Sequence, residues 1–207
     1  MLLDIQGPAG RLEALLDEGA TPPRAAVVFG HPHPMHGGTM HTKAVYQGAK
    51  GLTRIGCAVL RFNFRGVGSS EGAFDEGAGE MEDFRAALDL MADRYPGVPL
   101  WAAGFSFGSR IALETGADDP RVSALIGIAP PVNREGYTWD RTLLCEKPKF
   151  FVQGEMDELC PLKDMWAFYA KLKEPKELVV IDGARHLFEG KTKEVGEALE
   201  DLLGDFE

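Results

Sequence analysis

The chain alternates between short apolar runs and longer amphipathic segments. The apolar runs are rich in Val, Ile, Leu and Phe and are bounded by Gly or Pro, which is typical of buried β-strands. They predict strands over residues 25–29, 58–64, 98–103, 122–128, 149–152 and 178–181. Two further runs, residues 2–6 and 11–16, flank a Gly-Pro-Ala-Gly turn and predict an antiparallel hairpin at the edge of the sheet.

The amphipathic segments carry apolar residues at i, i+3 and i+4 spacing, as in Met81, Phe84, Leu88 and Met91. They predict helices over residues 42–54, 80–95, 107–115, 163–171 and 191–203. A strand and helix alternation with near-continuous apolar strands is typical of an α/β fold, in which helices cover both faces of a mostly parallel sheet. The length of 207 residues fits one domain, residues 1–207.

Charge and composition narrow the range of partners. The chain holds 32 acidic and 22 basic residues, a formal net charge of −10, so it lacks the basic surface that a phosphate backbone requires. We therefore expect no nucleic-acid partner and a small-molecule substrate instead. The sequence leaves the oligomeric state open, a homodimer included.

The location of the protein is predicted from its cysteines and its apolar runs. Cys57, Cys145 and Cys160 are odd in number and widely spaced, which suits a reducing compartment and predicts a cytoplasmic protein. The first residues contain no basic and apolar leader, and the longest apolar stretch, residues 124–132, is far shorter than a membrane span. We expect neither export nor a membrane partner.

One strand end carries a candidate nucleophile. The strand over residues 98–103 runs into Gly104-Phe105-Ser106-Phe107-Gly108 and then a helix, the setting of a G-x-S-x-G nucleophile elbow. Ser106 would sit in a strained turn, and Gly104 and Gly108 would let strand and helix approach each other closely. The alternative is that Ser106 only caps the helix.

Several segments together resemble a known family. His31-Pro32-His33-Pro34 follows the first parallel strand, residues 61–69 read Arg-Phe-Asn-Phe-Arg-Gly-Val-Gly-Ser, and the elbow, an acidic loop and a late histidine come next. In this order they resemble the α/β-hydrolase superfamily, specifically its small lidless, dienelactone-hydrolase-like carboxylesterases. The resemblance implies a single-domain α/β-hydrolase fold without a cap domain, and a catalytic order of Ser, then Asp or Glu, then His.

The base and the acid of this order can be sought in the loops after the later strands. His186 is the only histidine beyond Ser106, and it lies where the family places its general base. Asp157 occupies the family's acid position, where a carboxylate would orient the imidazole. Glu155 is the alternative acid, and Glu158 is expected to be a solvated loop charge.

Backbone N–H groups of two loops are candidates for the oxyanion hole. Phe107 follows the nucleophile and would supply one donor. The second donor should come from the loop after the first parallel strand, where Pro32 and Pro34 have no N–H. This leaves His33 as the expected donor and Met35 as the alternative.

The same loop also allows a second hypothesis, a metal-dependent hydrolase. The sequence His31-x-His33-x-Met35-His36 resembles the H-x-H-x-D-H motif of metallo-β-lactamase-type hydrolases, so a His31, His33 and His36 cluster could bind Zn²⁺. However, Met35 stands where that motif has a carboxylate, and the flanking prolines restrict the backbone. We therefore expect no metal and no other cofactor.

Residues 129–148 stand where larger relatives insert a cap, and they are too few to build one. We expect a shallow apolar pocket lined by Met35, Phe105, Tyr137, Trp139, Leu159 and Phe188. The sequence thus predicts a serine hydrolase of small soluble carboxylic esters that forms an acyl-enzyme on Ser106. A thioesterase or other acyl hydrolase on the same triad, or a non-catalytic ligand-binding relative, are alternatives.

Overall fold

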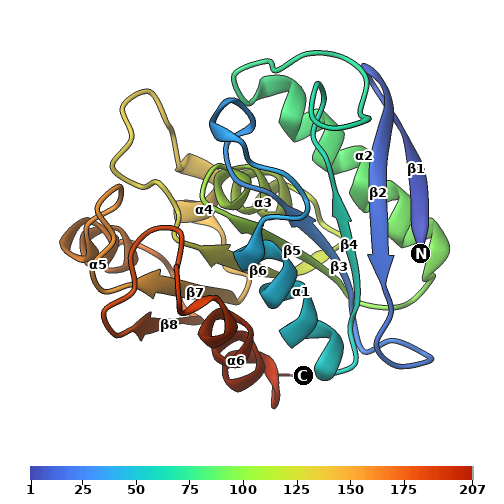
Figure 1. Ribbon diagram of the computed structural model, residues 1–207. Coiled ribbons are helices and arrows are strands. Elements are labelled where there is room, and N and C mark those ends of the chain that lie inside the picture. Colours follow the sequence, from blue (N-terminus) through green and yellow to red (C-terminus); the bar gives the residue numbers. More distant parts are fainter. Residues whose placement is uncertain (207) are drawn as a thin grey trace.

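The computed structural model describes residues 1–206 and contains an eight-stranded, mostly parallel sheet (Figure 1). Its strands are β1 (Leu2–Gly7), β2 (Gly10–Asp17), β3 (Ala26–Gly30), β4 (Ala58–Phe62), β5 (Leu100–Phe105), β6 (Val122–Ile128), β7 (Lys149–Gly154) and β8 (Lys176–Ile181). The described helices are α1 (Lys43–Arg54), α2 (Ala78–Arg94), α3 (Phe107–Asp118), α4 (Asp140–Leu144), α5 (Leu162–Tyr169) and α6 (Thr192–Leu203), with a short 3-10 helix, Pro34–His36.

The strand order across the sheet is β1-β2-β4-β3-β5-β6-β7-β8. Strands β1 and β2 form an antiparallel hairpin, and β2 also pairs antiparallel with β4. The pairs from β4 across to β8 are all parallel. The predicted α/β class, the parallel sheet and the edge hairpin are therefore confirmed.

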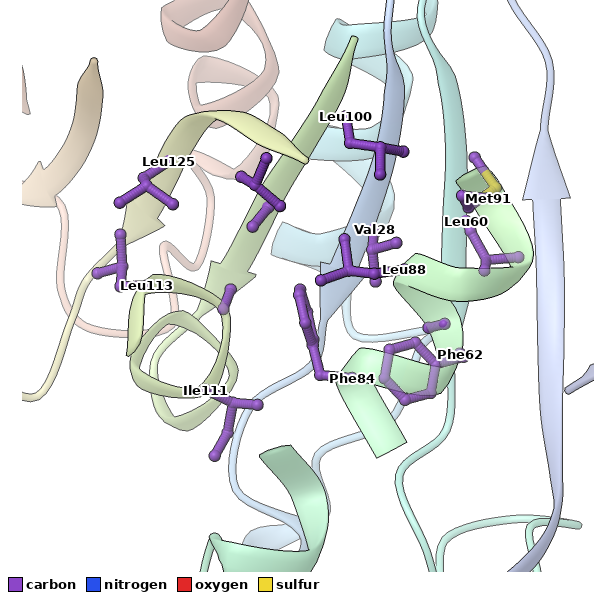
Figure 2. Packing of buried hydrophobic residues seen from close by; sticks show 14 of the residues in the cluster. Val28, Leu60, Phe62, Phe84, Leu88, Met91, Leu100, Ile111, Leu113 and Leu125 are labelled. Atoms are coloured by element: carbon purple, nitrogen blue, oxygen red, sulfur yellow. The ribbon is translucent and has the colours of Figure 1, made fainter. Parts of the chain in front are cut away.

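Helices cover both faces of the sheet, as the near-continuous apolar strands predict (Figure 1). Val27 and Phe29 of β3 point to the face that α1 and α6 cover, whereas Val28 points to the face of α2 and α3. Figure 2 shows the second face, where Phe62 and Phe84 pack between the sheet and α2. Because side chains alternate along a strand, each strand contributes to both cores.

The structure differs from the predicted boundaries mainly at the strand ends. Strand β5 begins at Leu100 and continues through Phe105, because Gly104 and Phe105 stay paired with β6. Strand β4 ends at Phe62, and the N–H of Phe64 instead donates to the His31 ring. Helix α4, which lies between β6 and β7, was not predicted, since its five residues are too few to show a helical period.

Three smaller features complete the fold. The three cysteines are buried and unbonded. Within the part of the chain that the structure describes, every helix falls short of the length and apolarity that a membrane crossing needs. The loops that follow the parallel strands meet at one edge of the sheet, which is where open parallel sheets bind their ligands.

Candidate active site

The turn between β5 and α3 holds Ser106 in a conformation that is rare for a residue with a side chain. Its φ is 53° and its ψ is −121°, and its N–H donates to the carbonyl oxygen of Ile128 at 2.8 Å. A Cβ atom at Gly104 would overlap the carbonyl oxygen of Gly108, and one at Gly108 would overlap that of Gly30. The close approach of β5, α3 and β3 therefore requires both glycines and presents Ser106 at the carboxyl edge of the sheet.

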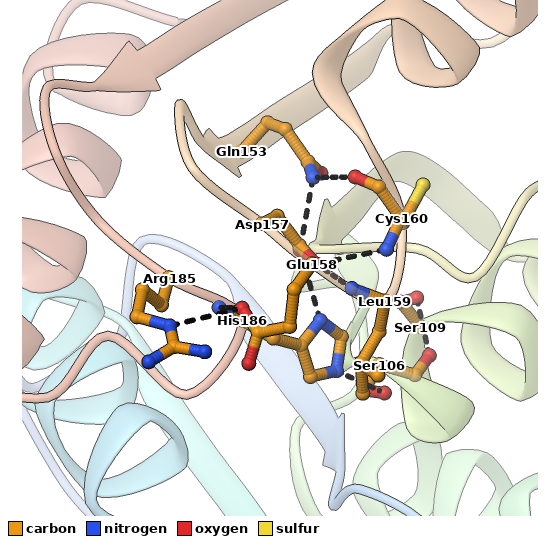
Figure 3. A network of polar contacts seen from close by, with 9 residues as sticks. All are labelled: Ser106, Ser109, Gln153, Asp157, Glu158, Leu159, Cys160, Arg185 and His186. Carbon is orange, nitrogen blue, oxygen red and sulfur yellow. Dashed lines mark hydrogen bonds and ion pairs between the residues drawn. The ribbon is translucent and has the colours of Figure 1, made fainter.

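Ser106, His186 and Asp157 form one hydrogen-bonded chain (Figure 3). The Ser106 Oγ lies 2.9 Å from His186 Nε2, and His186 Nδ1 lies 2.8 Å from Asp157 Oδ2. The three residues come from the loops after β5, β8 and β7, which are far apart in the sequence. His186 and Asp157 are almost completely buried, whereas Ser106 remains partly accessible.

The Asp157 carboxylate is held by several donors. Its Oδ1 accepts hydrogen bonds from the N–H groups of Leu159 and Cys160, at 2.9 and 2.8 Å. Its Oδ2 accepts one from Gln153 Nε2 at 3.0 Å, besides the bond with the imidazole of His186. These donors stabilise the negative charge of the carboxylate and fix its orientation toward the imidazole.

Gln153 is a buried polar residue of β7 that the sequence analysis did not identify. Its Nε2 donates both to Asp157 and to the carbonyl oxygen of Cys160, at 3.0 and 2.8 Å. Because both partners can only accept, the amide must present its NH₂ group to them. Its Oε1 is consequently buried with no hydrogen-bond partner in residues 1–206, a state that costs about 1–3 kcal/mol.

The other two carboxylates of the acidic loop have different partners. Glu155, the alternative acid, accepts a hydrogen bond from the N–H of Gly183 at 2.8 Å. Glu158 accepts one from the backbone N–H of His186 at 3.2 Å and also contacts the exposed Arg185. Both residues stabilise the backbone of the loop that carries His186. The carboxylate that contacts the imidazole is that of Asp157.

The candidate oxyanion donors border the same cavity as Ser106. The N–H of Met35 donates to the ring nitrogen Nδ1 of His33 at 3.2 Å, so this alternative donor is already engaged. The hydrogen bonds formed within residues 1–206 leave the N–H of His33 without an acceptor. Phe107 begins α3, and its ring lies 5.1 Å from that of His33.

His31 anchors its loop and is completely buried. Its Nδ1 lies 2.7 Å from the carbonyl oxygen of Pro32, and its Nε2 accepts a hydrogen bond from the N–H of Phe64 at 3.1 Å. Burial lowers the pKa of His31 to about 4, so the ring is neutral at pH 7.

The alternative metal site is not formed. Both ring nitrogens of His31 are engaged by backbone groups, so His31 cannot join His33 and His36 as a ligand. Residues 1–206 contain no group of three or more His, Cys, Asp or Glu side chains placed to hold a metal ion. The H-x-H-x-x-H spacing is therefore explained by loop anchoring and by stacking of the His33 and His36 rings.

A cavity of about 340 Å³ opens above Ser106. Its lining comes from the loops after β3, β5, β6, β7 and β8, and comprises His33, His36, Ser106, Phe107, Pro131, Asn133, Arg134, Tyr137, Leu159 and His186. Of the six residues expected to line the pocket, Tyr137 and Leu159 are present.

The other four expected pocket residues lie elsewhere, which corrects the sequence-based expectation. Phe105 and Phe188 are completely buried and pack together in the core beneath α6, because Phe105 ends a strand whose alternate side chains face that helix. Trp139 packs against Phe168, with ring centres 5.1 Å apart. Met35 is 69% exposed and lies outside the cavity lining.

Polar residues that the sequence analysis missed take their place. His36, Asn133 and Arg134 contribute to the lining beside Pro131. His36 was considered only as a metal ligand, and the only sequence signal for Asn133 and Arg134 is position, since residues 129–148 follow a strand whose carboxyl end borders the nucleophile turn. Polar residues such as these are common in all surface loops, so residue type does not distinguish the loop that lines the cavity.

Comparisons with known proteins identify the family of the chain. Residues 21–146 match the profile of the family described as serine aminopeptidase, S33. An uncharacterized protein of Rickettsia prowazekii is 36% identical over 204 residues, which are 95% of this chain and 86% of that protein.

Two solved structures are similar over almost the whole chain. An α/β serine hydrolase homologue from Coxiella burnetii has a TM-score of 0.91 and 39% identity, covering 98% of this chain and 97% of its own. An α/β serine hydrolase without a lid from Xanthomonas campestris has a TM-score of 0.87 and 32% identity, covering 97% and 92%. The chain therefore belongs to the α/β-hydrolase superfamily, to the family described as serine aminopeptidase, S33, and to the lidless branch of the superfamily.

Proposed function

We propose that this serine hydrolase cleaves small carboxylic esters through an acyl-enzyme on Ser106. The observation that carries the proposal is the Ser106, His186 and Asp157 chain, with contacts of 2.9 and 2.8 Å, at the floor of an open cavity. A serine that donates to a buried, oriented imidazole is the arrangement that activates a hydroxyl as a nucleophile.

The reaction follows from these contacts. The Ser106 oxygen attacks the ester carbonyl carbon while its proton passes to His186 Nε2, and Asp157 stabilises the imidazolium that forms. The oxyanion is stabilised by the N–H groups of His33 and Phe107. His186 then gives its proton to the departing alcohol oxygen, which leaves the acyl group on Ser106. A water molecule then gives a proton to His186 and attacks the acyl carbon, and His186 passes that proton to the Ser106 oxygen as the bond to the acid breaks. The scheme requires no cofactor.

The lining of the cavity favours an ester over the peptide that the name of the family describes. An aminopeptidase must bind the positively charged α-amino group of its substrate, for which a carboxylate in the pocket is the usual partner. None of the described lining residues is acidic, and Arg134 adds a positive charge. These features support cleavage of esters, or of thioesters by the same chemistry.

The decisive variant is Ser106→Ala, assayed with soluble para-nitrophenyl esters of short acids. We expect kcat to fall on the order of 10⁶-fold, the size seen when a triad nucleophile is removed. Ser123→Ala is the matched control, since Ser123 lies on β6 and its hydroxyl contacts the carbonyl oxygen of Leu100. Equal activity of Ser106→Ala and wild type would contradict the proposal, and wild type without turnover would favour a ligand-binding relative.

A further inference from the structure

One wall of the Ser106 cavity carries an arginine, Arg134, that forms no salt bridge within residues 1–206. Arg134 lies in the loop after β6 and lines the cavity, and its guanidinium carbon is 5.2 Å from the centre of the Tyr137 ring. A second guanidinium, that of Arg110 on α3, lies 4.3 Å from the same ring centre. Two cations therefore lie against one aromatic side chain beside the Ser106 cavity.

Neither arginine has a carboxylate partner in residues 1–206. The salt bridges formed there involve other arginines, and the Nε of Arg110 is buried with no hydrogen-bond acceptor. The Glu114 carboxylate accepts hydrogen bonds from the backbone N–H and the hydroxyl of Thr142, and its negative charge still acts on Arg110. Among the described residues, Arg134 alone therefore supplies a free positive charge at the cavity. Burying a guanidinium without a partner is costly, and loss of solvent lowers the pKa of Arg110.

The rest of the lining is free of negative charge. Glu158, the nearest acidic residue to Leu159 in the sequence, contacts Arg185 and the backbone N–H of His186 and is not part of the lining. Asp157 is buried beneath the imidazole. In a chain with a formal net charge of −10, a cavity with an unpaired arginine and no carboxylate among its described lining residues is a local region of positive potential.

The effect of Arg134 on its surroundings is visible at His33. The pKa of His33 is lowered to about 4, first by burial and then by the neighbouring His36 and the positive charge of Arg134. The imidazole of His33 is therefore neutral at pH 7. Positive charge at this wall comes from the guanidinium, whose planar donors match a carboxylate.

We infer that the Ser106 cavity selects esters whose acid or alcohol part carries a free carboxylate, and that Arg134 binds this carboxylate. Tyr137 holds the guanidinium of Arg134 against its ring. Arg134 thus acts as a specificity-determining residue for the proposed ester hydrolysis, on which this inference rests.

The test uses two pairs of esters that are matched in shape and differ in charge, with the rate of hydrolysis without enzyme subtracted for each. In the first pair, the para-nitrophenyl half-ester of glutaric acid is compared with the ester in which an isopropyl group replaces the free carboxylate. In the second pair, the acetate ester of para-hydroxybenzoic acid is compared with that of para-isopropylphenol. The measured quantity is the ratio of kcat/KM for the anionic ester to that for the neutral ester, in wild type and variants.

For at least one pair, we expect wild type to favour the anionic ester up to about fivefold, because solvent weakens an ion pair with an exposed arginine. Relative to wild type, Arg134→Met should lower the ratio by the whole of this factor, Arg134→Glu should lower it further, and Arg134→Lys should retain part of it. Added salt should lower the wild-type ratio. Arg94→Gln is the control. Arg94 is the last residue of α2 and does not line the cavity, so this variant should keep the wild-type ratio.

The failures of the inference and of the proposed function are distinguishable. If all variants hydrolyse both members of each pair and the ratio does not depend on residue 134, the inference is overturned and the ester hydrolysis stands. If wild type hydrolyses none of the four esters, the proposed function is overturned, and the inference with it.

Discussion

The two sides of the Ser106 cavity differ in how their polar groups are satisfied. On the side of the loops after β7 and β8, Asp157 and His186 are buried, and the four donors to the carboxylate are all protein groups. On the side of the loop after β6, Arg134 is exposed and has no carboxylate partner in residues 1–206.

Under the proposed function, this difference separates the residues that carry out the reaction from the residue that selects the substrate. A buried, fully bonded carboxylate and imidazole keep their geometry without substrate, which lowers the cost of reaching the transition state. The exposed Arg134, in contrast, would gain a carboxylate partner only when a substrate binds. Changes on the first side should therefore affect kcat, and changes on the second side should affect the choice of substrate.

The largest expected effect on the buried side concerns the acid. Asp157→Asn should lower kcat on the order of 10⁴-fold, because an amide that donates to Nδ1 favours the wrong imidazole tautomer. Steady-state kinetics of the purified variant checks this. Glu155→Gln is the matched control and should change kcat little, since its carboxylate bonds to Gly183. A larger loss for Glu155→Gln than for Asp157→Asn would move the acid to Glu155.

The next effect concerns stability below neutral pH. The pKa of His31 is about 4 in the fold against 6.5 for an exposed histidine, so the unfolded chain binds the extra proton between these values. The stabilisation is complete above pH 6.5 and is lost as the pH falls toward 4, by about 3 kcal/mol.

Urea denaturation as a function of pH tests this in wild type and His31→Gln. Wild type should lose about 3 kcal/mol more than the variant on acidification from neutral pH, because glutamine has no proton to bind. Free energies of unfolding that decline in parallel would show that His31 is not held neutral by the fold.

A smaller effect is expected at Gln153. Gln153→Leu removes the donor to Asp157 but also the buried, unpartnered Oε1. We expect kcat to fall about tenfold with KM unchanged, which corresponds to one hydrogen bond to a charged group. The downfield proton resonance of His186 Nδ1–H should broaden, a change that a purely structural residue would not cause. Unchanged kcat and resonance would show that Asp157 is oriented by its backbone donors alone.

The smallest effect distinguishes an open cavity from a covered one. With no cap over Ser106, each CH₂ added beyond a short acyl chain should no longer gain the roughly 0.8 kcal/mol of full burial. In a series of soluble esters, kcat/KM should peak at short acyl chains, with no increase when the substrate exceeds its solubility limit. A steep rise through long chains would mean that the loop around Tyr137 closes over the site.

Much of the fold follows from local patterns in the sequence. Strand β6 was predicted with its observed bounds, because Val122–Ile128 is an apolar run apart from the exposed Ser123 and pairs with a strand on each side. The ends of β5 were displaced, since pairing with β6 carries Gly104 and Phe105 into the sheet. Short α4 was missed, because tertiary packing rather than periodicity stabilises so short a helix.

The site was accessible to sequence reasoning only where a motif fixes the position. Ser106, Asp157 and His186 were named from the elbow, the acidic loop and the late histidine, and the structure brings them into contact. The cavity lining depends on which way each loop side chain turns. Phe105 turns into the core and Arg134 faces the cavity, and neither direction is encoded in local composition. Nothing in the sequence distinguishes Gln153 from other strand residues, because its role depends on hydrogen bonds to Asp157 and Cys160 that only the structure shows.

The central claim is that Ser106 is the activated nucleophile, and covalent labelling tests it most directly. The wild-type protein is treated with a fluorophosphonate probe, digested, and the labelled peptide is mapped by mass spectrometry. A serine reacts readily only when a base such as His186 removes its proton, so the label should appear on Ser106 alone. Labelling of Ser69, Ser70, Ser109 or Ser123 instead, or no labelling of the folded protein, would contradict the account.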